Sequence, residues 1–479
     1  MKTKRCVWMS AVLLLTAATG LRAQQTAALP MTLEKAIEIG LSENPTVLIA
    51  DQEIQRMEYV KKEAWGNLYP NLSGTGNFSH NIQKQKMFMG GGGFDFGSML
   101  GPTFQELFAN IPAAYQPDWS SMGGGSGESG GSNAPIEVGL RNSVTGGFSL
   151  SLPLFMPTIY KNIQLSEQQI LQAVESARQN KLTLANQIKK SYYGILLAES
   201  SLEVLKRNIE YAQIIVDDTR NSFNQGVVSE YDLITAEVQL SNLTPTLIQT
   251  ENSIRIARLT LNMLLSLPLD TELALEEELY DFKNFINASN YGYIDLSENS
   301  DLKLLGIQQD MLQKQLELQR TQRMPSLTGF AQYQVLSQSE DLKINHYRWL
   351  GSSSVGLQLN VPIFAGFTNK HRESQIRINM NQLQLQRDYQ EQALSLEAQT
   401  ALNNIEQARK QMVANEATKL QAEKGYRISK TRFDVGAGTM VELNNAQMAL
   451  LQADLNYSQS IFDYMSAQAD YDKIIGTEE

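Results

Sequence analysis

Residues whose type and spacing could support catalysis are few in this sequence. Segment 127–131 (GESGG) fits the G-x-S-x-G pattern of a nucleophilic serine, but it lies in a glycine-rich stretch and not between a strand and a helix. His80, His346 and His371 are isolated and lack metal-ligand spacing. No phosphate-binding glycine loop is present. We therefore predict no enzyme activity, no cofactor and no metal site.

The composition and the first residues predict an exported protein. The net charge of −11 is spread along 479 residues, which argues against nucleic-acid binding. Residues 1–23 are typical of a signal peptide, with a basic start, a short apolar core and Ala23 at the cleavage position. The only cysteine, Cys6, precedes the apolar core, which argues against a lipid anchor. No stretch reaches the roughly 18 apolar residues of a membrane-spanning helix.

The elements that would position any functional residue occur twice. Residues 223–226 (FNQG) correspond to residues 433–436 (FDVG), a shift of 210 residues. The same shift relates two apolar stripes with coiled-coil spacing. Their members are Leu184, Ile188, Ser191, Ile195, Ala198 and Leu202 in the first copy, and Leu394, Ala398, Ala401, Ile405, Ala408 and Met412 in the second. The alternative is two unrelated long helices that share a heptad.

The duplication predicts the division of the chain. We expect a first copy at residues 24–267, an acidic, irregular connector packed outside the helices at 268–300, and a second copy at 301–479. Residues 87–133 are a glycine- and serine-rich insertion in the first copy only. We expect this insertion to form an extracellular cap, with a plug in a channel mouth as the alternative.

Two segments in each copy alternate between apolar and polar residues. The clearest are 147–154 and 355–363, and their weaker partners lie at 71–79 and 328–334. Apolar and polar faces on one strand fit a lipid-facing barrel with a water-filled lumen. A soluble, half-buried hairpin fits the alternation equally well. Four strands are too few to close a pore, so a barrel would require several chains.

Helical periodicity runs through residues 160–222 and again through 369–433. About 63 residues would span on the order of 95 Å at ~1.5 Å per residue. Each long helix ends at a Phe-x-x-Gly turn, after which the chain reverses. The opening helix is expected at 33–65 and the first return helix at 230–267.

Over residues 33–476 the chain resembles the TolC family of outer-membrane efflux proteins. The resemblance is carried by Leu33–Ile37 (LEKAI), Asn44-Pro45, Leu68-Tyr69-Pro70, the two Phe-x-x-Gly turns with an acid six residues on, and the duplicated layout. It implies a mixed, mostly α fold: a long α-helical coiled-coil barrel plus a 12-stranded transmembrane β-barrel, closed by a homotrimer with four strands per chain. It also implies the outer membrane of a Gram-negative bacterium, a large periplasmic part, and outer-membrane lipid as the surroundings.

The resemblance assigns roles to residues at the two turns. Phe223, Gly226, Asp232, Phe433 and Gly436 would form the periplasmic tips that contact an adaptor protein. Glu442 and Asn445 would line the pore gate, where the family pattern has two acids, so the acidic ring would be reduced. Phe433 replaces the tyrosine of the family's closed-state lock, and Gly438 replaces its arginine.

Simpler readings of these residues remain open. Glu442 could be an acid favoured by the start of a helix, and the two glycines could serve only to give positive φ in a turn.

Three functions follow from this sequence. The leading hypothesis is a passive exit duct of a tripartite efflux pump, working with a periplasmic adaptor and an inner-membrane RND or ABC transporter. The first alternative is the exit duct of a type I protein secretion system. The second is a secreted coiled-coil scaffold or adhesin without a pore, against which the apolar strand faces argue. No nucleic-acid partner is expected.

Overall fold

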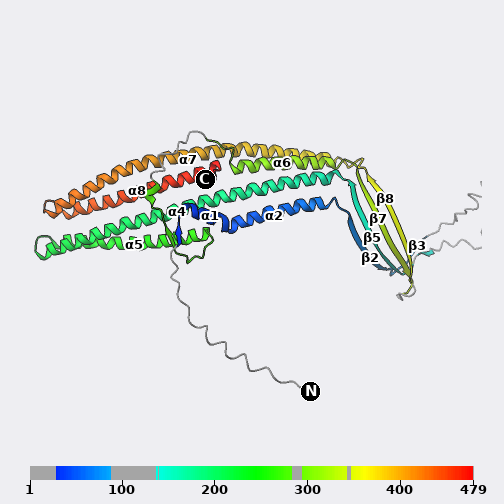
Figure 1. Ribbon diagram of the computed structural model, residues 1–479, viewed down its shortest axis with the longest axis horizontal. Coiled ribbons are helices and arrows are strands. Elements are labelled where there is room, and N and C mark those ends of the chain that lie inside the picture. Colours follow the sequence, from blue (N-terminus) through cyan, green and yellow to red (C-terminus); the bar gives the residue numbers. More distant parts are fainter. Residues whose placement is uncertain (1–28, 88–135, 139, 283–293, 342–346, 478–479) are drawn as a thin grey trace, which may run out of the picture. The chain divides into compact units, whose positions relative to one another are not determined.

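The computed structural model describes residues 29–87, 136–138, 140–282, 294–341 and 347–477. These form two compact units (Figure 1). The helical unit comprises the described parts of Met1–Glu63, Lys161–Arg320 and Gly366–Glu479, and the sheet unit those of Ala64–Tyr160 and Thr321–Ala365. The predicted signal peptide (1–23) and nearly all of the glycine-rich insertion lie outside the described residues. None of the described helices combines the length and the hydropathy needed to cross a membrane.

Two very long helices dominate the helical unit, as the periodicity predicts. They are α4 (Pro157–Asn224, 68 residues) and α7 (Thr368–Asp434, 67 residues). Each is followed by a shorter return helix, α5 (Glu230–Leu264) and α8 (Met440–Ile475), which lies beside it (Figure 1). Pro157 opens α4, where the missing N–H has no cost because the first turn of a helix leaves its N–H groups unbonded. The remaining long helix of the second copy is α6 (Ser300–Thr321).

The opening segment is two helices, so the predicted single helix over 33–65 is wrong. These are α1 (Leu33–Glu43) and α2 (Pro45–Gly66), and Asn44 between them is extended, with ψ 127°. Pro45 disfavours helical backbone at Asn44, and it has no N–H to continue the helix. The Asn44 side chain holds the break. It accepts a hydrogen bond from the Thr46 N–H and donates one to the Leu264 carbonyl, both at 2.8 Å.

The predicted apolar stripes lie in the core of the helical unit. In the second copy all six members are buried, and in the first copy Leu184, Ile188 and Ile195 are buried while the other three are half-buried. One cluster joins five of the second-copy members to residues of α1, α4, α5 and α8. Small residues such as Ala398 let helices approach closely, which long aliphatic side chains at every seam position would prevent. The repeat therefore predicts the buried face of both long helices.

The connector is more ordered and more buried than the sequence suggests. Its strand β6 (Leu273–Leu275) pairs in parallel with β1 (Leu29–Met31). Leu273, Leu279 and Phe282 are buried in the main cluster of the helical unit. The expectation of an irregular connector outside the helices is wrong for these residues. Most of the connector's residues are polar or acidic, which masks in the sequence the few apolar side chains that pack into the core.

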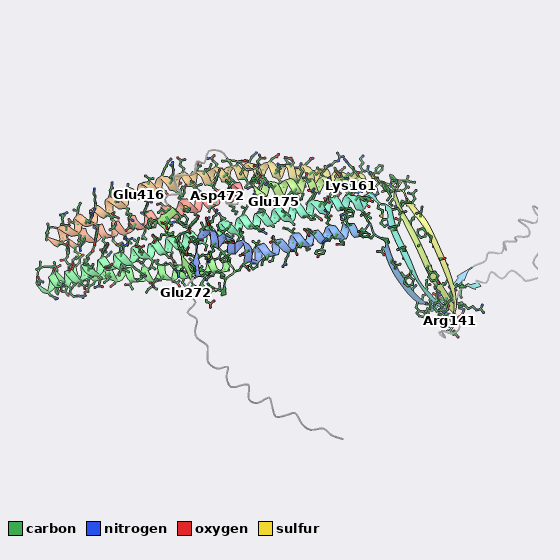
Figure 2. All side chains as sticks on the ribbon, in the orientation of Figure 1. Arg141, Lys161, Glu175, Glu272, Glu416 and Asp472 are labelled. Carbon is green, nitrogen blue, oxygen red and sulfur yellow. The ribbon has the colours of Figure 1, made fainter. Side chains whose placement is uncertain are left out.

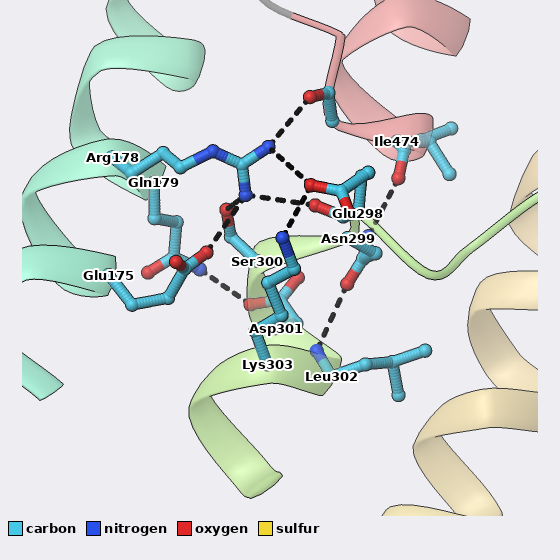
Figure 3. A network of polar contacts seen from close by, with 11 residues as sticks. Glu175, Arg178, Gln179, Glu298, Asn299, Ser300, Asp301, Leu302, Lys303 and Ile474 are labelled. Atoms are coloured by element: carbon cyan, nitrogen blue, oxygen red, sulfur yellow. Dashed lines mark hydrogen bonds and ion pairs between the residues drawn. The ribbon is translucent and has the colours of Figure 1, made fainter. Parts of the chain in front are cut away.

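A polar network fixes the C-terminal end of α8 (Figure 3). The guanidinium of Arg178, on α4, donates to the carbonyls of Gly476 (2.8 Å) and Glu298 (2.9 Å) and to the carboxylate of Glu175 (3.0 Å). The Asn299 amide donates to the Ile474 carbonyl at 2.7 Å. The network therefore joins α4, the residues before α6, and the end of α8.

Ion pairs join neighbouring helices elsewhere in the helical unit. Lys161 of α4 lies 2.8 Å from Glu317 of α6, and Lys190 of α4 lies 2.8 Å from Asp470 of α8. Figure 2 shows Glu416, Asp472, Glu175 and Lys161 following one another along this unit, so charged side chains occur over much of its length.

The sheet unit contains one antiparallel sheet of four strands in the order β2-β5-β7-β8. The strands are β2 (Asn71–His80), β5 (Asn142–Phe155), β7 (Ser326–Ser339) and β8 (Arg348–Asn360). Each predicted pair is present, and β5 pairs with β7 to join the two copies. The alternation predicted through residue 363 overshoots the end of β8 at Asn360. A separate pair, β3 (Gln85–Met87) and β4 (Ile136–Val138), flanks the predicted insertion.

The register sorts the sheet into apolar and polar rows. One row crosses all four strands as Leu72, Leu150, Ala331 and Val355, and the next row along the strands is Ser73, Ser149, Gln332 and Ser354. Neighbouring residues of a strand point to opposite faces, so these two rows lie on opposite sides of the sheet. Val355 is 84% exposed and Leu357 68% in the single chain. The sheet thus has an exposed apolar face and a polar one.

Candidate functional site at the two helix-to-helix turns

The candidate site consists of the turns that end α4 and α7. We call residues 222–232 the first tip turn and residues 432–442 the second. Gly226 and Gly436 both have φ +73°, the left-handed conformation that glycine adopts without steric cost. In each turn the glycine N–H donates to the carbonyl of the phenylalanine three residues before it, at 2.8 Å and 2.9 Å. The next residue donates to a carbonyl five residues back, which completes a Schellman motif.

The return helices begin with side-chain caps. Ser229 caps α5, and Asp232 accepts from both the backbone N–H and the hydroxyl of Ser229, at 3.2 Å and 2.6 Å. This is a capping box, with Asp in place of the usual Glu or Gln. Thr439 caps α8 by accepting from the Glu442 N–H at 3.2 Å. Local hydrogen bonding therefore sets both reversals of the chain.

A separate apolar cluster supports the turns from within the helical unit. It draws Ile215 and Val216 from α4 and Met440 and Leu443 from α8. Phe433 packs against this cluster, so its ring contributes to the packing that supports the turn. Phe223, the equivalent residue of the first turn, is 38% exposed.

Tyr426 of α7 stacks on Tyr211 of α4, with ring centroids 5.6 Å apart. Burial, together with the charges of Tyr211 and Asp434, raises the pKa of Tyr426. Its phenol is therefore neutral and contributes to packing at neutral pH.

The two predicted gate residues lie on the exposed side of α8. Glu442 is the third residue of that helix, and Asn445 follows one turn later; both are exposed. The Glu442 carboxylate lies 3.4 Å from the guanidinium of Arg432, the residue before Phe433. Arg432 also donates to the Ala437 carbonyl at 3.2 Å, which spans the turn.

Sequence reasoning missed Arg432. The available signal was a cation in the last turn of one helix and an acid at the third position of the next. Gly438 also has a local role, because a Cβ at this position would lie 3.1 Å from the Arg432 Cβ. Within the residues that the structure describes, no group of three His, Cys, Asp or Glu side chains is placed to hold a metal ion.

Comparison with known proteins decides the family. The sequence pattern described as "Outer membrane efflux protein" matches residues 113–266 and 294–477, more than half of the chain. The chain belongs to this outer membrane efflux protein family. The expected family, its mainly helical fold with a small sheet, and the outer-membrane location are thereby confirmed.

Individual relatives agree with this membership. The outer membrane protein TolC of Vibrio cholerae is 22% identical to this chain, over 72% of this chain and 78% of TolC. The alkaline protease secretion protein AprF of Pseudomonas aeruginosa is 24% identical over 68% of each chain. The crystal structure of the Campylobacter jejuni CmeC outer membrane channel superimposes with a TM-score of 0.67 over 93% of this chain and 85% of CmeC, at 16% identity. The last likeness shows a shared fold.

Proposed function

We propose that this chain is one protomer of a trimeric duct through which a partner pump expels its substrate across the outer membrane. The observation that carries the proposal is the sheet with one exposed apolar face, one polar face and two open edges. Within the described residues, β2 and β8 each pair with a strand on one side only. Backbone groups left unpaired in lipid cost several kcal/mol each, so the edges require partner strands. Three four-stranded sheets would supply the twelve strands of a closed barrel.

Exposed apolar stripes on the helices also support assembly. Large apolar side chains of α7 are exposed in two runs separated by 17 residues: Ile378, Leu385, Tyr389 and Leu396, then Val413, Leu420 and Ile428. A second stripe follows α5: Tyr231, Ile234, Val238, Ile248, Ile256, Leu259 and Met263. Most neighbouring members are three, four, seven or eight residues apart, the spacings of a helix face that packs against other helices. In a soluble monomer these side chains would expose apolar surface to water along two helices.

The tip turns are the surface that we assign to a periplasmic adaptor. Val227 and Tyr231 are exposed in the first, and Val435 and Val441 are exposed in the second. Tyr231 and Val441 occupy equivalent positions of the two copies, so three chains would present six related apolar contacts. An inner-membrane RND or ABC transporter would complete the machine, with the duct itself passive. Phe223, Gly226, Asp232, Phe433 and Gly436 would shape this surface.

Glu442 and Asn445 are our proposed gate residues. Three Glu442 carboxylates, one per protomer, would form an acidic ring that attracts cations and repels anions. Single-channel recording of E442Q tests this ring. We expect lower cation selectivity and weaker block by divalent cations, and no change in either property would rule the ring out.

Planar-bilayer recording of the protein purified in detergent, together with gel electrophoresis before and after heating, tests the duct as a whole. We expect heat-resistant trimers that conduct ions. Monomers, or oligomers that never conduct, would favour a scaffold or adhesin without a pore.

A type I secretion duct remains the second candidate, and the resemblance to AprF favours it, since the name of that protein assigns it to secretion of alkaline protease. Isolation of the native complex would separate the two forms of transport. An RND transporter in the complex would support efflux, whereas an ABC transporter encoded beside a secreted protein would support secretion.

A further inference from the structure

The duplicated turns place two acids at equivalent positions but give them different partners. Asp232 and Glu442 are related by the 210-residue shift, and each is the third residue of its return helix. The first turn of a helix favours an acid in either case, because the helix dipole is positive at the N-terminus. Position alone therefore does not distinguish the two acids, and their neighbours must.

The first acid is engaged in holding its own turn. The Asp232 carboxylate accepts two hydrogen bonds from Ser229, one from the backbone N–H and one from the hydroxyl. The position of the first copy that corresponds to Arg432 is Ser222, whose hydroxyl donates to the Asp218 carbonyl. No cation stands opposite Asp232 at that equivalent position.

The second acid is not used as a cap. Thr439 accepts the Glu442 N–H, but the longer Glu442 side chain extends to Arg432 at 3.4 Å. Arg432 is held there by its bond to the Ala437 carbonyl and by its place two residues before the end of α7. Both side chains are about half exposed, 53% and 47%, so the pair faces water. An exposed pair of this kind adds little to stability, and its main effect is on the local field.

We propose that Arg432 is a specificity-determining counter-charge at the periplasmic end of the duct, a proposal that rests on the proposed function. Three Glu442 side chains alone would place three negative charges around the aperture. With each carboxylate 3.4 Å from a guanidinium, the charges oppose each other well within the Debye length of ~8–10 Å. The wild-type aperture is therefore only weakly cation-selective. The weak cation selectivity is due to Arg432 as well as to the absence of a second acid at Asn445.

Bilayer recording of four charge variants in full-length protein tests this proposal. R432Q should raise the cation-to-anion permeability ratio several-fold and strengthen block by Mg²⁺. E442Q should shift both properties in the opposite direction, and R432Q/E442Q should return close to wild type. R432K keeps the positive charge but lacks the planar guanidinium group, so its selectivity should stay near that of wild type.

Lys430 provides the matched control, because K430Q removes the same charge two residues earlier on α7, outside the second tip turn. We expect K430Q to change the permeability ratio less than twofold. Equal shifts in R432Q and K430Q would mean that only overall charge matters, and would overturn the proposal. Selectivity of R432K like that of R432Q would overturn it too, because the arginine would then act through its hydrogen bonds.

Two further readouts separate this proposal from the proposed function. Loss of heat-resistant trimers in R432Q but not in R432K or K430Q would assign Arg432 to bracing the turn, against a role as counter-charge. Absence of conductance in wild-type protein would reject the duct, and the counter-charge with it. Conductance in wild type with no shift in R432Q would reject the counter-charge alone.

Discussion

Lys419 and Asp454 form an ion pair between the long helix α7 and its return helix α8, with the Lys419 Nζ 3.0 Å from an Asp454 carboxylate oxygen. Asp454 is only 9% exposed. The Lys419 ammonium also lies 5.6 Å and 5.5 Å from the ring centroids of Tyr280 and Tyr457. Tyr280 belongs to the connector and stacks on Tyr457 of α8. One cation therefore joins both helices to the connector.

Replacement of Lys419 should destabilise the helical unit more than replacement of its partner. K419M leaves the buried Asp454 carboxylate without a counter-charge, and we expect the free energy of unfolding to fall by about 2 kcal/mol. The loss is smaller than for a fully buried pair because the Lys419 side chain is partly exposed to water. D454N leaves a lysine that water can still reach, so about 1 kcal/mol is expected. Reversible unfolding followed by circular dichroism measures both. An equal or larger loss in D454N would show that the carboxylate is not the buried partner.

The same pair predicts how stability changes at alkaline pH. Burial lowers the pKa of Lys419, but the hydrogen bond and charge of Asp454 outweigh it, and the net pKa is raised from 10.5. A raised pKa in the folded state means that the contribution is complete below the ordinary value and is lost as the pH rises through the folded value. The difference in Tm between wild type and K419M should therefore stay constant from pH 7 to about pH 10 and shrink above it. Shrinkage already between pH 7 and pH 9 would contradict this assignment.

Periodicity predicted the long helices because it is repeated over many turns, and it predicted the sheet faces because alternation fixes which residues share a side. The residues that the sequence did not reveal are those whose partner lies far along the chain. Asp454 follows Ala453 in an otherwise apolar pattern, and only the fold brings Lys419 to it. Asn44-Pro45 is visible in the sequence as a motif, but the apolar periodicity continues across it and hides the helix boundary that it forms.

The candidate site was predictable where local chemistry sets it. Gly226 and Gly436 occupy the left-handed turn positions that their spacing indicates. The capping role of Asp232 and the pairing of Glu442 with Arg432 depend on side-chain length and on how each turn closes. The arrangement of three chains around an axis lies beyond what one chain contains, so the gate remains a prediction.

Gly146 and Gly147 offer an adjacent test of how closely the two copies pair in the sheet. A Cβ on Gly147 would lie 2.3 Å from the Tyr333 backbone oxygen of β7, whereas one on Gly146 would lie 3.7 Å from the nearest atom. Backbone cannot move aside as a flexible side chain can. G147A should therefore sharply reduce the yield of heat-resistant trimers in outer-membrane fractions, while G146A should retain most of it. Equal yields of the two variants would mean that β5 and β7 do not approach this closely.

Gly476, at the end of α8, should be the least replaceable described glycine of the polar network around Arg178 (Figure 3). It has φ +78°, and a Cβ there would lie 2.4 Å from the Glu298 carbonyl oxygen and 3.3 Å from the Arg178 guanidinium. The added methyl group would push the end of α8 away from the segment before α6, which Arg178 holds together. This cost adds to the roughly 1 kcal/mol for a non-glycine residue in the left-handed conformation. We expect G476A to lower the free energy of unfolding by about 2–3 kcal/mol.

Gly425 is the matched control, since it lies within α7 with open space around its Cβ position, and G425A should be neutral or stabilising by up to about 1 kcal/mol. Chemical denaturation of both variants measures the contrast, and an unchanged stability in G476A would show that the end of α8 is free to move away from Glu298.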